Sequence, residues 1–230
     1  MQPEWVSTKA LHDIREIRAD VRNNGWVKTD LGNLGCALDE APEAAARLLG
    51  QPLKGRAGQT VEALAPLEPW AAKPKSLSVV YGLGSFPMHT DGAHYMQPPR
   101  FVVLVCASPG TSQVPTTLIR FRDLPFKPPE RERLEVSPFL IRNGRRSFYS
   151  TICSRSRPFV RYDAGCMVSQ GGDGEVVARL VAQRTKEVGP ALVSWQTGDV
   201  LIIDNWNVLH GRGLGPQASP DRRLLRVVVQ

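Results

Sequence analysis

The chain has 230 residues, of which 42% are hydrophobic and 22% charged, and 29 Lys and Arg against 22 Asp and Glu give a net charge of +7. This composition excludes a disordered chain, and no apolar run approaches the roughly 18 residues that a membrane span needs. We expect one globular domain over residues 1–230. We place it in the cytoplasm, because the start of the chain carries charges where a signal peptide has an apolar stretch.

The cysteines and the basic residues give weaker information. Four cysteines show no C-x-x-C pair and no zinc-site spacing, which predicts reduced thiols in or near the core. The positive charge gathers between residues 142 and 161, in a segment that reads as a strand rather than as a basic recognition helix. A solvated surface is the preferred interpretation, with an acidic substrate and then nucleic acid as alternatives.

The first third of the chain predicts helices. Apolar residues at three- and four-residue steps indicate an amphipathic helix over 8–23 that ends at Asn24-Gly25. A short strand at 26–29 follows, and a second helix at about 42–49 begins with Pro42 and ends at Gly50.

From about residue 76 the pattern changes to short β-branched and aromatic runs between Gly/Pro turns. One further helix is expected at 174–186. The predicted strands are SLSVVYG (76–82), RFVVLVCA (100–107), TTLIRF (116–121), RSFYSTI (146–152), FVRY (159–162), ALVSW (191–195), DVLIID (199–204) and RLLRVVV (223–229). Many short strands favour a mostly β (α+β) chain, a sandwich or jelly roll with N-terminal helices packed on it.

The best candidate for a metal site is His89-Thr90-Asp91. On an extended segment, residues two apart project to the same face, so His89 and Asp91 can reach one ion while Thr90 points away. The third ligand must come from a distant strand, and the candidate is His210, at the end of the apolar run DVLIIDNWNVLH. Two histidines and one carboxylate leave three positions open, as in non-haem Fe(II) oxygenases.

The closing segment DRRLLRVVV (221–229) places Arg222, Leu224 and Arg226 on one face of a strand. An arginine inside a barrel needs an anionic partner, because an unpaired buried guanidinium is costly. A carboxylate ligand would supply that partner through two parallel hydrogen bonds. The alternative is that these arginines lie on a solvated edge strand.

These segments together resemble the taurine dioxygenase and clavaminate synthase-like branch of the Fe(II)/2-oxoglutarate oxygenases. The resemblance rests on SLSVVYGLGSFPMHTDGAHYMQPPRFVVLVC (76–106), WQTGDVLIIDNWNVLHGRG (195–213) and DRRLLRV (221–227). It implies a double-stranded β-helix (jelly roll) core at 76–229 behind a helical N-terminal part at 1–75.

The resemblance also implies roles for single residues. His89, Asp91 and His210 match the iron ligands. Arg226 matches the arginine that binds the distal carboxylate of 2-oxoglutarate, and Arg222 matches a supporting arginine. Thr117 matches the threonine that assists the same carboxylate, although Val114-Pro115-Thr116-Thr117 replaces the usual Gly-Gly-x-Thr turn and leaves the choice between Thr116 and Thr117 open.

The implied activity is hydroxylation, desaturation or cyclisation at an unactivated C–H bond of a small metabolite, with release of succinate and CO2. An amino acid, free or carrier-bound, is the expected kind of substrate. Fe(II), 2-oxoglutarate and O2 are the implied cofactors, and ascorbate is expected to support activity. Related halogenases replace the carboxylate ligand with a small residue, so Asp91 argues against halogenation.

Three further residues are candidate substrate contacts, because positions beside metal ligands face the pocket: Tyr81, His94 and Arg212. The loops near 92–98 and 163–175 are expected to cover the site, since only 119 residues separate Asp91 from His210. Two alternatives remain at this stage. One is a nucleic-acid-directed demethylase of the same superfamily, motivated by the charge, and the other is a cupin-like metal-binding protein without turnover.

Overall fold

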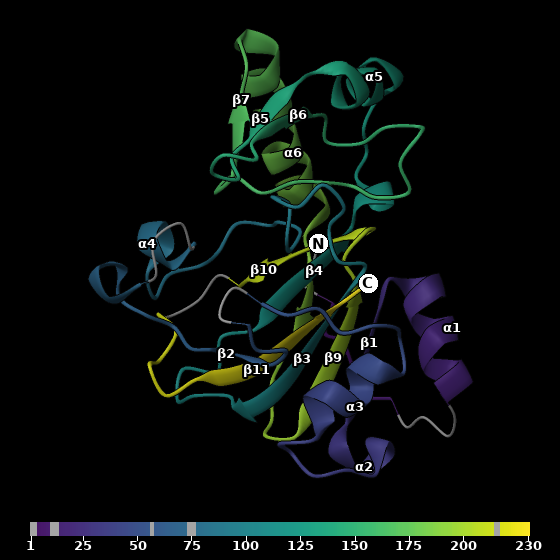
Figure 1. Ribbon diagram of the computed structural model, residues 1–230, viewed down its shortest axis with the longest axis vertical. Helices are drawn as coiled ribbons and strands as arrows, with labels where there is room; N and C mark the ends of the chain where they lie inside the picture. The colour runs from purple at the N-terminus through teal and green to yellow at the C-terminus, as the bar shows by residue number, and fades with distance from the viewer. Residues whose placement is uncertain (1–3, 10–13, 56–57, 73–76, 214–216) are drawn as a thin grey trace.

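The computed structural model describes residues 4–9, 14–55, 58–72, 77–213 and 217–230, and it shows a mixed α/β fold with antiparallel sheets (Figure 1). The helices are α1 (Ile14–Asn24), α2 (Leu31–Leu34), α3 (Ala41–Arg47), η1 (Pro69–Ala71), α4 (Ser78–Tyr81), η2 (Phe121–Asp123), α5 (Pro128–Val136) and α6 (Gly172–Val188). The strands are β1 (Trp26–Asp30), β2 (Glu62–Leu64), β3 (Phe101–Ser108), β4 (Thr116–Arg120), β5 (Phe139–Ile141), β6 (Phe148–Ser150), β7 (Met167–Ser169), β8 (Ala191–Val193), β9 (Asp199–Asp204), β10 (Val208–Arg212) and β11 (Arg223–Val229).

The largest sheet has the strand order β1-β9-β3-β11-β2, and a second sheet has the order β10-β4-β8. Side chains alternate along a strand, so those of β3 enter two different apolar cores. Val103 and Val105 pack with residues of α1 and α3 on one face, whereas Val102 and Leu104 pack with Leu118 of β4 on the other. The large sheet therefore has helices on one face and the second sheet on the opposite face.

Residues 121–190 form a separate part of the structure, which we call the lobe. It contains η2, α5, α6 and the small sheet β6-β5-β7, and it lies at the top of Figure 1. Apolar side chains of α5, α6, β5 and β7 pack together there with Ile119 and Leu209 of the second sheet. The lobe thus has its own core, and that core extends onto the strands β4 and β10.

Most predicted elements are confirmed. α1 ends at Asn24, and Gly25 follows with φ +85°. α3 and α6 lie where helices were expected, and strands are present within six of the eight predicted runs. The helix predicted over 8–23 begins at Ile14 in the described residues. The predicted start is wrong, because residues 8 and 9 are not helical and the N–H of Lys9 bonds to the carbonyl of Lys28 instead. Residues 10–13 of the prediction, among them His12, lie outside the described residues.

Two predicted strands are wrong. Within 76–82 the structure has the helix α4, in which the N–H of Gly82 bonds to the carbonyl of Ser78, and Gly82 ends the helix at φ +50°. Two neighbouring valines suggested a strand, but no strand in the described residues pairs with this segment. Within 159–162 the backbone bonds to three different segments rather than to one strand: Val160 to Trp206, Arg161 to Ile152, and Tyr162 to Thr90.

None of the helices in the described part of the chain combines the length and apolar character that would let it cross a membrane.

Candidate metal centre

Backbone pairing places the two candidate histidine ligands directly opposite each other. The N–H of His89 bonds to the carbonyl of His210 at 2.8 Å, and the N–H of His210 bonds back to His89 at 2.9 Å. His210 lies on β10, which is separated from β9 by the turn 205–207, so the run DVLIIDNWNVLH forms two strands rather than one. The two imidazole rings lie 4.7 Å apart between centroids.

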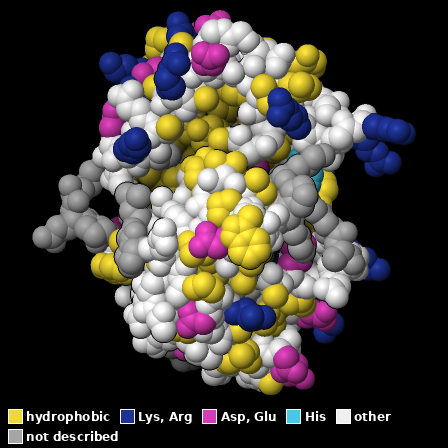
Figure 2. Space-filling view, turned by 90° about the vertical axis from the view of Figure 1, so that its left-hand side faces the viewer, with side chains coloured by type: hydrophobic (Ala, Val, Ile, Leu, Met, Phe, Trp, Pro, Cys, Tyr) yellow, Lys and Arg dark blue, Asp and Glu magenta, His cyan; other side chains and the backbone are white. Residues whose placement is uncertain are grey.

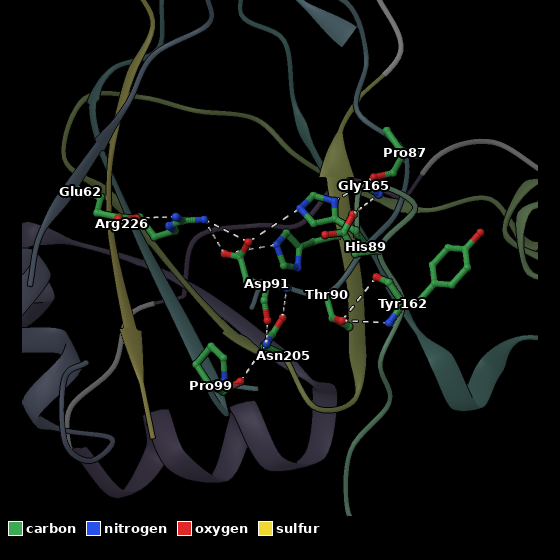
Figure 3. A network of polar contacts seen from close by, with 12 residues as sticks. Glu62, Pro87, His89, Thr90, Asp91, Pro99, Tyr162, Gly165, Asn205 and Arg226 are labelled. Atoms are coloured by element: carbon green, nitrogen blue, oxygen red, sulfur yellow. Dashed lines mark hydrogen bonds and ion pairs between the residues drawn. The ribbon is translucent and has the colours of Figure 1, made fainter. Parts of the chain in front are cut away.

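The Asp91 carboxylate completes a compact group of donor atoms (Figure 3). Its two oxygens lie 3.9 Å from Nε2 of His89 and 3.9 Å from Nε2 of His210. All three ligand atoms lie within 4.8 Å of one another, and His89 and His210 are 8% and 6% exposed. The described residues contain one such group, and it consists of the three residues chosen from the sequence.

The protonation states of these side chains suit a metal. Nδ1 of His89 lies 2.9 Å from the carbonyl of Pro87, which can only accept a hydrogen bond, so Nε2 is the nitrogen directed at Asp91. Burial lowers the pKa of His210 to about 3, so that imidazole is neutral. Burial acts to raise the pKa of Asp91, but the charge and the hydrogen bonds of Arg226 oppose it, and the pKa is lowered to about 2.

Hydrogen bonds fix the backbone that carries Asp91. Asn205, fully buried in the turn after β9, accepts from the N–H of Asp91 at 2.7 Å and donates to the carbonyls of Asp91 and Pro99 at 3.0 and 2.8 Å. Gly92 follows at φ +66°, where a Cβ would lie 2.5 Å from Pro99. A glycine is therefore required at the turn that directs the chain away from the site.

Thr90, between two candidate ligands, is attached to the lobe. Its N–H bonds to the carbonyl of Tyr162 at 2.7 Å, and its hydroxyl accepts from the N–H of Tyr162 at 3.1 Å. No sequence pattern pointed to Tyr162, because the contact joins residues 72 positions apart.

The structure places Arg226 against Asp91. Its Nη1 donates to both carboxylate oxygens, at 3.0 and 2.9 Å, and its Nη2 bonds to Glu62 of β2. Burial acts to lower the pKa of Arg226, but Asp91 and Glu62 outweigh it and raise the pKa. Glu62 was missed by the sequence analysis, because only the pairing of β2 with β11 brings it opposite Arg226.

Arg222 has a different environment. It is buried, its Nη2 lies 3.5 Å from the hydroxyl of Thr116, and its Nε has no hydrogen-bond partner. Burial lowers its pKa to about 10, and no carboxylate in the described part of the chain pairs with it. Trp195 also donates to the Thr116 hydroxyl, whereas the neighbouring Thr117 donates to the sulfur of Met88. Thr116 and Thr117 thus face opposite sides of β4, and Thr116 faces Arg222.

The three candidate substrate contacts are held in different ways. Arg212 is buried, donates to the carbonyls of Gly82 and Gly84, and lies 3.9 Å above the ring of Phe86. Tyr81 is on α4 and meets Phe86 edge-on. The ring of His94 is tilted by 40° against that of Tyr95, with 4.2 Å between the centroids, and His94 is not part of the triad.

Two imidazoles and one carboxylate leave adjacent coordination positions open, and this donor set is typical of non-haem Fe(II) oxygenases. The donor atoms therefore fit an iron(II) ion, with the Nδ1 of His210 left without a described partner. The fold and this donor set together are those expected of a non-haem Fe(II) oxygenase.

Comparison with known proteins agrees with that class. Residues 191–228 match the family model "Taurine catabolism dioxygenase TauD, TfdA family", and this stretch contains His210, Arg222 and Arg226. The match confirms the resemblance inferred from the sequence. A search of curated proteins by sequence gives no match.

Solved structures share the fold at low sequence identity. The PvcB protein from Pseudomonas aeruginosa has a TM-score of 0.70 and 19% identity, over 100% of this chain and 87% of that chain. An asparagine oxygenase in complex with Fe(II), 2S,3S-3-hydroxyasparagine and succinate has a TM-score of 0.70 and 18% identity, over 94% and 78%. The non-haem iron oxygenase OrfP in complex with Fe, succinate and (3S)-hydroxy-L-Arg has a TM-score of 0.68 and 20% identity, over 94% and 80%.

Proposed function

We propose that this chain is an Fe(II)- and 2-oxoglutarate-dependent oxygenase that oxidises an unactivated C–H bond of a small amino acid-type metabolite. The observation that carries the proposal is that the ligand atoms of His89, Asp91 and His210 lie within 4.8 Å of one another. Iron bound there, with 2-oxoglutarate and O2, supplies the oxidising chemistry, while the protein binds, orients and shields the reactants.

The chain's own residues would hold the metal in a fixed geometry. Pro87 sets the tautomer of His89, and Asn205 fixes the backbone of Asp91. Such supporting hydrogen bonds keep a ligand in one orientation and so reduce the cost of organising the site on binding. Because Asp91 is present as a carboxylate ligand, we propose hydroxylation, desaturation or cyclisation rather than halogenation.

For the cosubstrate, the geometry favours Arg222 with Thr116. A buried guanidinium without an acidic partner lacks the compensation that Arg226 already has from Asp91 and Glu62. The distal carboxylate of 2-oxoglutarate would supply it, with the Thr116 hydroxyl as a further donor. The sequence-based assignment to Arg226 and Thr117 stays a competing prediction.

For the substrate, the chain offers one charge of each sign beside the metal ligands. Arg226 and Glu62 have side chains that are 25% and 27% exposed, so solvent reaches both. A free amino acid carries a carboxylate and an ammonium that match this pair. Two of the structural neighbours were solved with hydroxylated amino acids, hydroxyasparagine and hydroxyarginine, which supports the same class of substrate. Arg212 is buried and already engaged by backbone carbonyls, which weighs against it as a substrate contact.

We further propose that residues 1–230 form one domain and that the two facing sheets are a jelly roll. The apolar core between β3 and β4 supports this arrangement. A cytoplasmic location is supported by the four cysteines, which form no disulfide in the described residues, since disulfides are rare in reducing compartments. A small molecule rather than nucleic acid is the proposed partner.

The test is turnover. Purified protein with Fe(II), 2-oxoglutarate and O2 should convert at least one of the common L-amino acids to a product 16 mass units heavier, for oxygen insertion, or 2 lighter, for desaturation or ring closure. Succinate should form in equal amount. Absence of product and of succinate with free and carrier-bound amino acids, in protein shown to bind iron, would refute the proposal.

A further inference from the structure

The lobe contains an open cavity of about 290 Å³, and none of the candidate metal ligands lines it. β7 and α6 lie in the upper half of Figure 1, and Figure 2, which views that side of the molecule, shows a hollow there with apolar side chains on its floor. The cavity is lined by Phe139, Tyr162, Ala164, Met167, Ser169, Glu175, Ala178 and Arg179. Nothing in the proposed reaction uses this cavity.

The lining combines an apolar floor with a charged rim. Phe139 and Met167 are buried members of the lobe core, and methionine adapts its shape to different ligands. Glu175 and Arg179 lie one turn apart on α6, with 3.8 Å between Oε2 and Nη1. Their side chains are 62% and 72% exposed, so this pair contributes little to stability and is free to exchange partners.

We propose that the cavity is a second binding site, for an amino acid with an apolar side chain. The volume lies at the lower end of the range for ligand pockets, so it suits one ring or a branched aliphatic chain. The carboxylate of the ligand pairs with Arg179 and its ammonium with Glu175. Because the rim carries one charge of each sign, it favours a zwitterion over a dicarboxylate or a diamine.

One wall of the cavity is connected to the metal centre. The hydroxyl of Tyr162 bonds to the carbonyl of Ala178 at 3.3 Å, while its backbone holds Thr90 through bonds of 2.7 and 3.1 Å. A ligand that packs on Tyr162 and Ala178 therefore acts on the residue between His89 and Asp91. The cavity is thus an effector site, and the coupling must be reciprocal: whatever the ligand does to metal affinity, the metal does to ligand affinity.

The binding test uses L-phenylalanine and metal-free protein, followed by calorimetry, so that it does not depend on turnover. We expect saturable binding in the millimolar range, as few contacts form. Ala164→Leu, which fills the cavity from its exposed edge, and Arg179→Gln should each raise Kd about tenfold. Ala182→Leu, an exposed alanine one turn further along α6 and outside the lining, is the matched control and should leave Kd unchanged.

Two analogues test the rim. 3-Phenylpropionate lacks the ammonium and phenethylamine lacks the carboxylate, so each should bind about tenfold more weakly than phenylalanine. No saturable binding of phenylalanine would overturn the proposal. Binding that survives Ala164→Leu and Arg179→Gln but is lost in Arg226→Ala would also overturn it, because the ligand would then occupy the proposed substrate site.

The coupling is measured with Mn(II), which stands in for Fe(II) without oxidation. Saturating phenylalanine should change the Kd for Mn(II) about fivefold, and Ala164→Leu should abolish that change. An equal Kd for Mn(II) with and without phenylalanine would refute the effector role.

Discussion

The two-sheet core and the lobe contribute to the candidate metal centre in different ways. In the core, β10 pairs with β4, β11 pairs with β3 and β2, and an isolated bridge joins His89 to His210. These long-range pairings bring residues 89, 210 and 226 to one place. In the lobe, three-residue strands and irregular segments surround one long helix. The core determines which atoms meet, whereas the lobe reaches the site through a few specific bonds, chiefly those of Tyr162 to Thr90 and of Arg161 to the loop after Asp91.

Arg161 shows how the lobe makes such a connection. It is 1% exposed, donates to the carbonyls of Ala93, Tyr95 and Met96, and lies over the rings of Phe148 and Phe159. No carboxylate pairs with it among the described residues. Substitutions at the metal centre in the core should therefore abolish activity, whereas substitutions in the lobe should reduce activity by smaller amounts.

The largest expected effect is the loss of metal affinity on substitution of a ligand in the core. His210→Ala removes one of three ligands, and because loss of a supporting hydrogen bond alone costs 10- to 100-fold in affinity, the Kd for Mn(II) should rise by more than about 1,000-fold. Equilibrium dialysis under anaerobic conditions measures it. His94→Ala, outside the triad, is the control, and equal losses in both variants would contradict the assignment.

The next largest effect distinguishes Arg226 of β11 from Arg222, which lies one residue before that strand. Arg222→Ala should weaken 2-oxoglutarate binding roughly 100-fold, because it removes the buried cation that pairs with the distal carboxylate. Arg226→Ala should instead raise KM for the substrate, with a much smaller effect on 2-oxoglutarate. Titration of the Fe(II)–2-oxoglutarate absorption band decides between them. If Arg226→Ala is the variant that loses the cosubstrate, the sequence-based assignment is correct.

A smaller effect, on the free energy of unfolding, is expected for a substitution where the lobe contacts the core. Arg161→Met keeps the stem of the side chain but leaves the carbonyls that Arg161 served without a donor, which should cost about 3 kcal/mol of unfolding free energy. Urea denaturation measures this cost. Hydrogen exchange should increase in residues 92–98 while β3 and β9 stay protected. Uniform loss of protection would mean that the lobe and the core unfold as one unit.

The smallest effect concerns α4, where the strand prediction was wrong. Val80 is 70% exposed, so Val80→Ala should stabilise the protein by a few tenths of a kcal/mol through higher helix propensity. The same substitution in a strand would destabilise it. A decrease in the urea midpoint would therefore count against the helix.

Local spacing made part of the site predictable. His89 and Asp91 are two residues apart in an extended segment, and the apolar runs of β3, β9 and β11 have the composition of buried strands. His210 and the two arginines were found because they lie in or beside such runs. The helix at 78–81 was not predicted, because two neighbouring valines fit a strand equally well when the partner strand is not known.

What the sequence by itself determined is the set of residue types and their short-range order: an H-x-D, a histidine after an apolar run, and two arginines four residues apart in the closing segment. Only the tertiary structure decided which of these meet. Strand register placed Arg226 opposite Glu62 and Thr116 on the side of Arg222, and the lobe brought Tyr162 to Thr90. The reason is physical: side-chain alternation is a local property, whereas the partner across a sheet or between packed layers depends on long-range pairing.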